Sequence, residues 1–162
     1  MNCQLCKKNP FSHSFLHFGT TDQKENLLYT SPARATARET TQSFEALKLH
    51  IQEYSGKPWI WVLDCSNMEL HSMYTMGFSM AIADILAKEH MRSLTHILVL
   101  SPNGWIYRVL HALRPEVLER IWFADTHAER NSACKQFGFT SEAKTWLSLA
   151  LTRSPNQTLP PV

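Results

Sequence analysis

Few glycines occur in this sequence, and their scarcity argues against several common kinds of active site. Only 5 of the 162 residues are glycine. The sequence has neither a G-x-G-x-x-G fingerprint nor a Walker A motif, the glycine-rich loops that bring backbone amides close to phosphate groups. It also lacks the G-x-S-x-G elbow of serine hydrolases. We therefore expect a protein that is not an enzyme.

Strong charge and long apolar stretches are absent as well. The formal net charge of +2 is too small to indicate a nucleic-acid partner. No apolar stretch approaches the roughly 20 residues that a membrane-spanning helix needs. The opening MNCQLCKKNP has no apolar core of the kind that signal peptides carry. We therefore expect a cytoplasmic protein, whose 4 cysteines are thiols or metal ligands rather than disulfides.

Three short apolar runs predict the central sheet. They cover residues 59–63, 96–100 and 121–124, and turn-forming or acidic residues follow each of them. Short runs rich in β-branched and aromatic residues are typical of strands buried on both faces. Helical patterns over 69–90 and 105–113 separate the runs. The predicted fold class is therefore α/β, with a mostly parallel sheet flanked by helices.

We divide the chain into three parts. Residues 1–25 are expected to form a small cysteine-containing hairpin or knuckle, residues 26–152 the α/β domain, and residues 153–162 a flexible tail that contains prolines. A hairpin joins the first two parts, with one strand up to Phe18 and the next over 26–30. The remaining helices are expected from Thr40 or Thr41 to Tyr54, from 126–129 to 136, and from 140–142 to 151.

Two basic residues follow the hairpin. Arg34 and Arg38 lie four residues apart in a segment of small residues. They belong either to a solvated connector or to a contact with a phosphate or headgroup.

The first cysteines are candidate metal ligands. Cys3 and Cys6 form a C-x2-C pair, which can hold one tetrahedral Zn2+ from a tight turn if two further ligands are found. His13 and His17 would complete the set. A helix over 11–18 would place both histidines on one face, whereas a strand would separate them by about 13 Å, so that only one reaches the metal. We predict one structural Zn2+; the alternative is exposed thiols and surface histidines.

Two segments carry the pattern of a known family. WIWVLDCSNM (59–68) resembles a central strand that ends in aspartate. ILVLSPNGWIYRVLHALRPEVLERIWF (97–123) is similar to a succession of strand, turn, aromatic residue, gate helix, basic residue with proline, and strand. Both patterns resemble those of the CRAL-TRIO family of lipid-binding domains, related to the yeast phosphatidylinositol-transfer protein, and the resemblance covers roughly residues 26–147.

The resemblance implies binding, and transfer, of a lipid or another small hydrophobic ligand. The ligand would occupy an apolar cavity covered by an amphipathic gate helix over 105–113, which touches a membrane surface transiently. Burial of the ligand tail would contribute roughly 0.8 kcal/mol per methylene. The expected lining residues are Met73, Met76, Met80, Leu98, Leu100, Trp105, Ile106, Val109 and Phe123. Counterparts to the family's inositol-phosphate ligands are missing, so no phosphoinositide specificity is expected.

Two alternatives to the carrier remain open. Divergent members of the family act as protein-binding scaffolds with a collapsed cavity, and the 5 Trp and 8 Phe suit both possibilities because aromatic side chains fill a cavity as well as line one. An enclosed pocket beneath 105–113 would favour the carrier, and a solid core there the scaffold. A hydrolase-like enzyme would instead bring Asp64, His71 and His96 together around a cleft.

Overall fold

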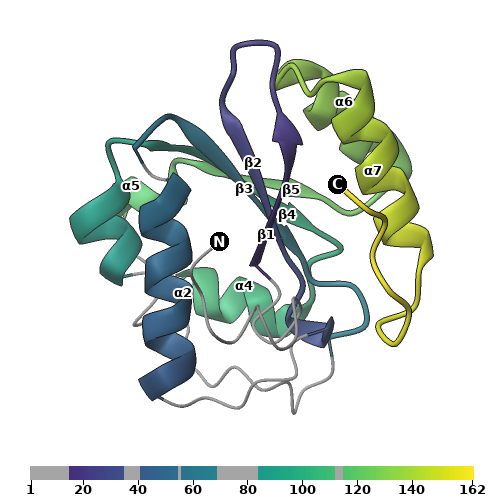
Figure 1. The fold of residues 1–162 in the computed structure, drawn as a ribbon. Helices are drawn as coiled ribbons and strands as arrows, with labels where there is room; N and C mark the ends of the chain where they lie inside the picture. The colour runs from purple at the N-terminus through teal and green to yellow at the C-terminus, as the bar shows by residue number, and fades with distance from the viewer. Residues whose placement is uncertain (1–14, 35–40, 55, 69–83, 112–114) are drawn as a thin grey trace.

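The computed structural model describes residues 15–34, 41–54, 56–68, 84–111 and 115–162. These residues form a five-stranded sheet in which the strands are neighbours in chain order (Figure 1). The first two strands pair antiparallel and the others pair parallel. The strands are β1 (Phe15–Thr20), β2 (Asn26–Thr30), β3 (Trp59–Asp64), β4 (Leu94–Leu100) and β5 (Ile121–Ala124). The predicted α/β class with a mostly parallel sheet is thus confirmed.

Helices cover both faces of the sheet. Figure 1 shows α6 (His127–Gln136) and α7 (Ser141–Thr152) on one side, with α2 (Thr41–Tyr54), α4 (Gly104–His111) and α5 (Pro115–Leu118) on the other. The predicted helices near 41–54, 105–113, 127–136 and 141–151 are confirmed within the described residues. Of the helix predicted over 69–90, residues 69–83 lie outside the described residues. Its end is helical and includes the π-helical turn η2 (Leu86–His90).

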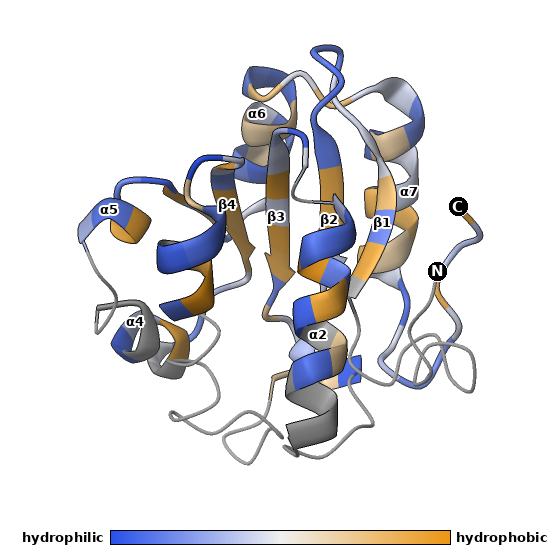
Figure 2. Cartoon of the chain, turned by 60° about the vertical axis from the view of Figure 1, so that its left-hand side comes forward, coloured by the Kyte–Doolittle hydropathy of each residue, from blue (hydrophilic) through white to orange (hydrophobic). Residues whose placement is uncertain are grey.

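Each strand supplies side chains to both faces, because successive residues of a strand point in opposite directions. In β2, Tyr29 belongs to the core on the side of α7, while its neighbour Leu28 belongs to the core on the side of α2. Figure 2 shows the hydrophobic strands behind α2, along which hydrophilic and hydrophobic residues alternate. We call the two sets of buried residues the α7-side core and the α2-side core.

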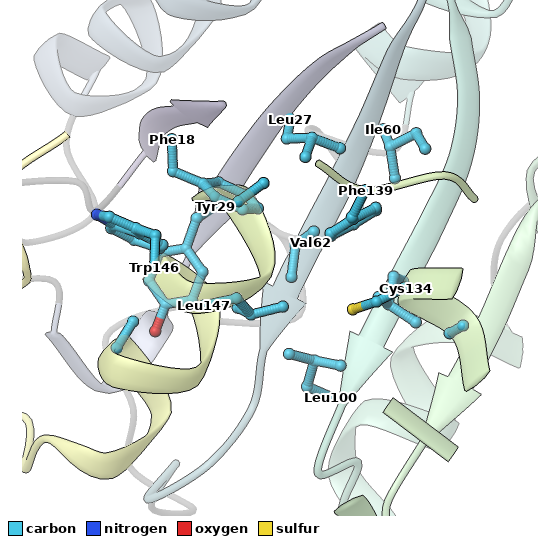
Figure 3. Packing of buried hydrophobic residues seen from close by; sticks show 14 of the residues in the cluster. Phe18, Leu27, Tyr29, Ile60, Val62, Leu100, Cys134, Phe139, Trp146 and Leu147 are labelled. Carbon is cyan, nitrogen blue, oxygen red and sulfur yellow. The ribbon is translucent and has the colours of Figure 1, made fainter. Parts of the chain in front are cut away.

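Large aromatic side chains dominate the α7-side core (Figure 3). Trp146 of α7 stacks on Phe18 of β1, with ring centroids 4.8 Å apart, and meets Tyr29 edge-on at 5.3 Å. The α2-side core is largely aliphatic and contains Ile51 of α2, Val99 of β4 and Ile106 of α4. Aromatic pairs of this kind stabilise a core beyond the burial of their area, so the α7 side is the more strongly cross-linked of the two.

Local signals in the sequence fix the ends of α6. The Thr126 side chain accepts a hydrogen bond from the Glu129 amide, and the Glu129 carboxylate accepts from the Thr126 amide, which makes a reciprocal cap. At the other end, Gly138 has φ +65°, and the amides of residues 138 and 139 donate to the carbonyls of Lys135 and Cys134. This is a Schellman termination, in which glycine takes the left-handed position without a steric penalty.

The hairpin is confirmed, but the division of the chain changes. β1 pairs with β2 along its length and so belongs to the main sheet. Our boundary between residues 25 and 26 therefore falls inside one sheet rather than between two parts. Residues 15–20 are a strand, which excludes the helical alternative for His17. Residues 1–14, which would form the rest of the predicted knuckle, lie outside the described residues.

The last ten residues pack against the domain, although we predicted a flexible tail. Leu159 is buried, and the Trp146 indole N–H donates to the Pro160 carbonyl at 3.0 Å. The buried Arg34 guanidinium donates to four main-chain carbonyls in this region, those of Ala150, Arg153, Pro155 and Gln157. Arg34 is therefore neither a solvated connector residue nor available to a phosphate; it anchors the end of the chain.

Candidate functional site

The elements α4 and β5 carry half of the exposed large hydrophobic side chains in the described part of the structure. The described residues include six exposed large hydrophobic side chains, and three of them lie on these two elements: Tyr107, Trp122 and Phe123. The other three, Leu49, Leu149 and Val162, belong to α2, α7 and the C-terminus. Of the three on α4 and β5, Tyr107 and Phe123 meet on one face of the sheet, and exposed apolar side chains that lie together mark an interaction site more often than isolated ones do.

Tyr107 and Phe123 form a pair at the corner between α4 and β5. Their rings are 4.9 Å apart between centroids and tilted by 36°. Tyr107 is 41% exposed and Phe123 is 43% exposed, so the pair presents ring surface to solvent. On the same helix, Ile106 is buried in the α2-side core. Helix α4 therefore places one residue in the core and the next in an accessible aromatic pair.

Polar contacts fix the beginning of α4 at the carboxyl end of the sheet. The chain leaves β4 through Ser101, which has φ +48°. The Asn103 side chain then accepts a hydrogen bond from the Ile106 amide at 3.0 Å and so caps the helix. The Asn103 amide group also donates to the Met68 carbonyl, at 3.5 Å. The helix start is thus tied to the loop after β3, at the edge where open α/β sheets collect ligands.

Trp122 is exposed on the opposite face of the same strand. It pairs with Leu98 of the α7-side core, while Phe123 pairs with Val99 of the α2-side core. Its ring meets Phe137 edge-on at 5.3 Å, and 39% of the residue remains exposed. Exposed aromatic groups therefore lie on both faces of the last strand.

The sheet separates the lining residues that we predicted. Leu98 and Leu100 are fully buried in the α7-side core, whereas Ile106 and Phe123 lie on the α2 side. Because the sheet stands between the two pairs, they do not line one cavity, and we correct the predicted lining by removing Leu98 and Leu100. Met73, Met76 and Met80 lie outside the described residues. Trp105 and Val109 belong to α4, but their side chains lie outside the description.

Asp64 ends β3 as part of a satisfied polar network. One of its carboxylate oxygens accepts from the Tyr29 hydroxyl at 2.5 Å, and the other accepts from the Ser66 amide at 3.0 Å and hydroxyl at 2.6 Å. Burial, reinforced by the negative charge of Asp64, raises the pKa of Tyr29 far above its usual range. Asp64 thus accepts hydrogen bonds from the neutral Tyr29 and from Ser66 and stabilises the loop after β3. Its carboxylate has the partners of a structural group rather than those of a general base.

The structure does not bring Asp64 and His96 together. His96 lies four residues before Leu100, the residue level with Asp64, which is about 13 Å along the strand. Its ring packs on Phe137 at 4.5 Å, and burial lowers its pKa. His71 lies outside the described residues. The described pair therefore lacks the contact that a general acid–base pair requires.

Of the candidate zinc ligands, only His17 belongs to the described residues. Cys3, Cys6 and His13 lie outside them. His17 stacks on Tyr54 of α2, with centroids 5.0 Å apart and planes within 10°. Burial lowers its pKa, and its Nε2 is buried without a hydrogen-bond partner in the described part of the chain. A neutral imidazole is the form that binds Zn2+. Because the other three candidate ligands lie outside the described residues, the zinc site stays a prediction.

The two described cysteines are buried thiols. Burial raises the pKa of Cys134 to about 11 and that of Cys65 above its usual range. A thiol becomes a good nucleophile when its pKa is lowered rather than raised. Neither residue therefore has the environment of a catalytic cysteine.

Sequence reasoning overlooked Tyr107 and Trp122 as site residues. A signal was present for Trp122, because it precedes Phe123 in the last strand and adjacent strand residues face opposite sides. None of the helices that the structure describes has the length and apolar character needed to cross a membrane. Comparison of the sequence with known protein families and with curated proteins finds no match. Function must therefore be argued from the geometry of the α4–β5 corner.

Proposed function

We propose that this protein binds, and transfers, a lipid or another small hydrophobic molecule at the α4–β5 corner. The observation that supports the proposal is the half-exposed, tilted ring pair of Tyr107 and Phe123 beside the buried Ile106. An amphipathic helix with an accessible aromatic pair suits contact with acyl chains, because a tyrosine ring is apolar while its hydroxyl stays hydrated.

The mechanism needs no covalent step. By the CRAL-TRIO resemblance, α4 takes the place of the gate helix that covers the ligand. We propose that Tyr107 and Phe123 meet the acyl region of a membrane or lipid first, while movement of α4 carries Ile106 away from the α2-side core to admit the ligand. Affinity would come from burial of the ligand chain, at roughly 0.8 kcal/mol per methylene.

The test combines native mass spectrometry with vesicle binding. The full chain is incubated with a mixed lipid extract, and its native mass is compared with its denatured mass. We expect an excess of several hundred daltons that organic solvent releases as lipid. We also expect Tyr107→Ala to weaken sedimentation with phosphatidylcholine vesicles several-fold, since each half-buried aromatic contributes on the order of 1 kcal/mol. Leu149→Ala, which alters an exposed apolar residue on α7, is the matched control and should behave like the wild type.

A non-enzymatic scaffold is the second candidate. It is favoured by Ile106, which was expected to line a cavity but is buried among side chains of the α2-side core. The same experiment separates the two candidates. A protein that shows no mass excess after incubation with lipid extract, and no sedimentation with vesicles, would be a scaffold rather than a carrier.

A further inference from the structure

We propose that the outer edge of β5 binds an extended segment of a partner protein, which adds to the sheet as a further strand. This inference goes beyond lipid binding, because the contact is made by the main chain of β5 rather than by α4. Strand addition to an exposed sheet edge is a common mode of peptide recognition, in which backbone hydrogen bonds provide much of the affinity.

The hydrogen bonds of β5 show which of its backbone groups face outward. The carbonyls of Arg120 and Ala124 accept from the Ile97 and Ser101 amides of the neighbouring strand. In a parallel pair, alternate residues bond to the same neighbour, so even-numbered residues face β4. The amides and carbonyls of Ile121 and Phe123 therefore point away from the sheet. Among the described strands, none lies beyond β5.

Side chains at this edge are apolar and accessible. Trp122 is 39% exposed on one face and Phe123 is 43% exposed on the other, so apolar contact area flanks the free backbone groups on both sides. Natural edge strands are commonly protected by charged residues or proline. The strand reads IWFA and contains neither. An edge of this composition favours pairing with another extended segment.

Acidic residues flank the edge and define the partner. Glu119 and Asp125 are exposed at its two ends, and neither carboxylate has a partner among the described residues. Arg120, which lies between these two acidic residues, is turned inward, where its guanidinium donates to the carbonyls of Met91 and Leu94. The partner segment should therefore carry Lys or Arg at its ends and alternating apolar residues between them, since opposite charges across strands are favourable.

The same charges disfavour a second copy of this chain. Antiparallel pairing centred on Trp122 would place Glu119 opposite Asp125 of the other copy, which are like charges. Pairing centred on Phe123 would place Asp125 against the apolar Ile121 instead. Neither register offers the opposite charges that a basic partner segment provides.

The experiment selects peptides from a random dodecapeptide display library on the immobilised full chain. We expect enrichment of extended sequences with alternating apolar residues and Lys or Arg at the ends. Phe123→Pro removes one outward amide at an edge position where proline is tolerated, and it should weaken the enriched peptides about tenfold, as expected for a lost hydrogen bond. Phe123→Ala keeps the amide and should weaken them less. Circular dichroism checks that both variants fold.

A charge-reversed variant keeps the test decisive if the proline variant does not fold. Glu119→Lys combined with Asp125→Lys changes two exposed side chains and should shift the selected peptides from basic to acidic ends. Tyr107→Ala retains every outward backbone group of β5, so it should weaken vesicle binding more than peptide binding, which separates this inference from the proposed function. No enrichment on the wild-type chain, unchanged peptide ends on the charge-reversed variant, or a dimer in solution that Phe123→Pro dissociates would each overturn the proposal.

Discussion

The two sides of the sheet differ in how completely the described side chains enclose them. On the α7 side, the large aromatic residues stack on one another, and the indole of Trp146 and the hydroxyl of Tyr29 both have hydrogen-bond partners. On the α2 side, the core reaches α4, where the buried Ile106 is followed by the half-exposed Tyr107. Both sides are hydrophobic in sequence, yet only the α2 side ends in an aromatic pair of which both rings are accessible; on the α7 side the exposed Trp122 packs on the buried Phe137.

From this difference we propose that the α7-side core mainly stabilises the fold, whereas the aromatic pair on the α2 side serves recognition. A buried aromatic residue with a satisfied polar group gains from both packing and hydrogen bonding. An exposed aromatic pair contributes little to the free energy of folding, and its ring surface remains accessible to a ligand. Substitutions on the α7 side should therefore change the free energy of unfolding, whereas substitutions of Tyr107 or Phe123 should change binding with little effect on stability.

The largest effect is expected for Trp146→Ala. The substitution removes a buried indole that stacks on Phe18 and holds the Pro160 carbonyl, and such truncations cost about 3–5 kcal/mol. Urea denaturation measures the loss. The control is Leu149→Ala on the exposed side of the same helix, which should stay within about 0.5 kcal/mol of the wild type. Equal losses in the two variants would contradict the assignment of the α7-side core.

A smaller loss is expected for Tyr29→Phe. The substitution keeps the ring and removes the hydroxyl, which leaves one buried oxygen of Asp64 without its partner. An unsatisfied buried group of this kind costs about 1–3 kcal/mol. Tyr107→Phe, whose ring is exposed, should change the free energy of unfolding very little. If Tyr29→Phe and Tyr107→Phe had the same free energy of unfolding, the hydrogen bond between Tyr29 and Asp64 would not contribute to the stability of the fold.

The pH dependence of stability should be the smallest effect and should arise on both sides of the sheet. Burial lowers the pKa of His17 on the α2 side and of His96 on the α7 side. Both histidines are then neutral in the folded protein. In the unfolded chain the same side chains bind protons when the pH falls below the usual histidine pKa of about 6.5. Stability is therefore unaffected above this pH and falls as the pH drops below it.

Urea midpoints measured between about pH 8 and pH 5 check this prediction. His17→Gln and His96→Gln should each reduce the acid-induced loss, because glutamine does not titrate. Leu149→Ala, which alters an exposed side chain that does not titrate, should leave the profile of the wild type. Stability that rose on acidification would mean that the histidines are charged in the folded protein.

Much of the fold could be predicted because strands and helices leave periodic patterns. The runs at 59–63, 96–100 and 121–124 became β3, β4 and β5, and the polar loop after Phe18 became a hairpin. The end of the chain was harder to predict. Prolines and polar residues favoured a flexible tail, but Arg34 and Trp146 bind its carbonyls from distant positions in the sequence. Long-range contacts of this kind leave no local pattern.

The candidate site was predicted only in part for the same reason. Of the residues expected to line a cavity, Ile106 and Phe123 lie on the α2 side at the α4–β5 corner, whereas Leu98 and Leu100 lie on the α7 side. In a strand buried on both faces, the hydrophobicity of adjacent residues predicts that all of them are buried. It does not predict which face of the sheet each side chain lies on. Strand alternation would have divided Leu98 from Val99, but it could not say which helices cover each face.

The sequence by itself determined most of the described secondary structure and the parallel order of the later strands, since these depend on local composition and spacing. Only the tertiary structure decided the rest. It placed the C-terminal helices on one face, turned Arg34 and Arg120 toward the protein's own carbonyls, and left Tyr107, Trp122 and Phe123 accessible. Exposure depends on which distant segments cover a residue, and the identity of the residue does not reveal that.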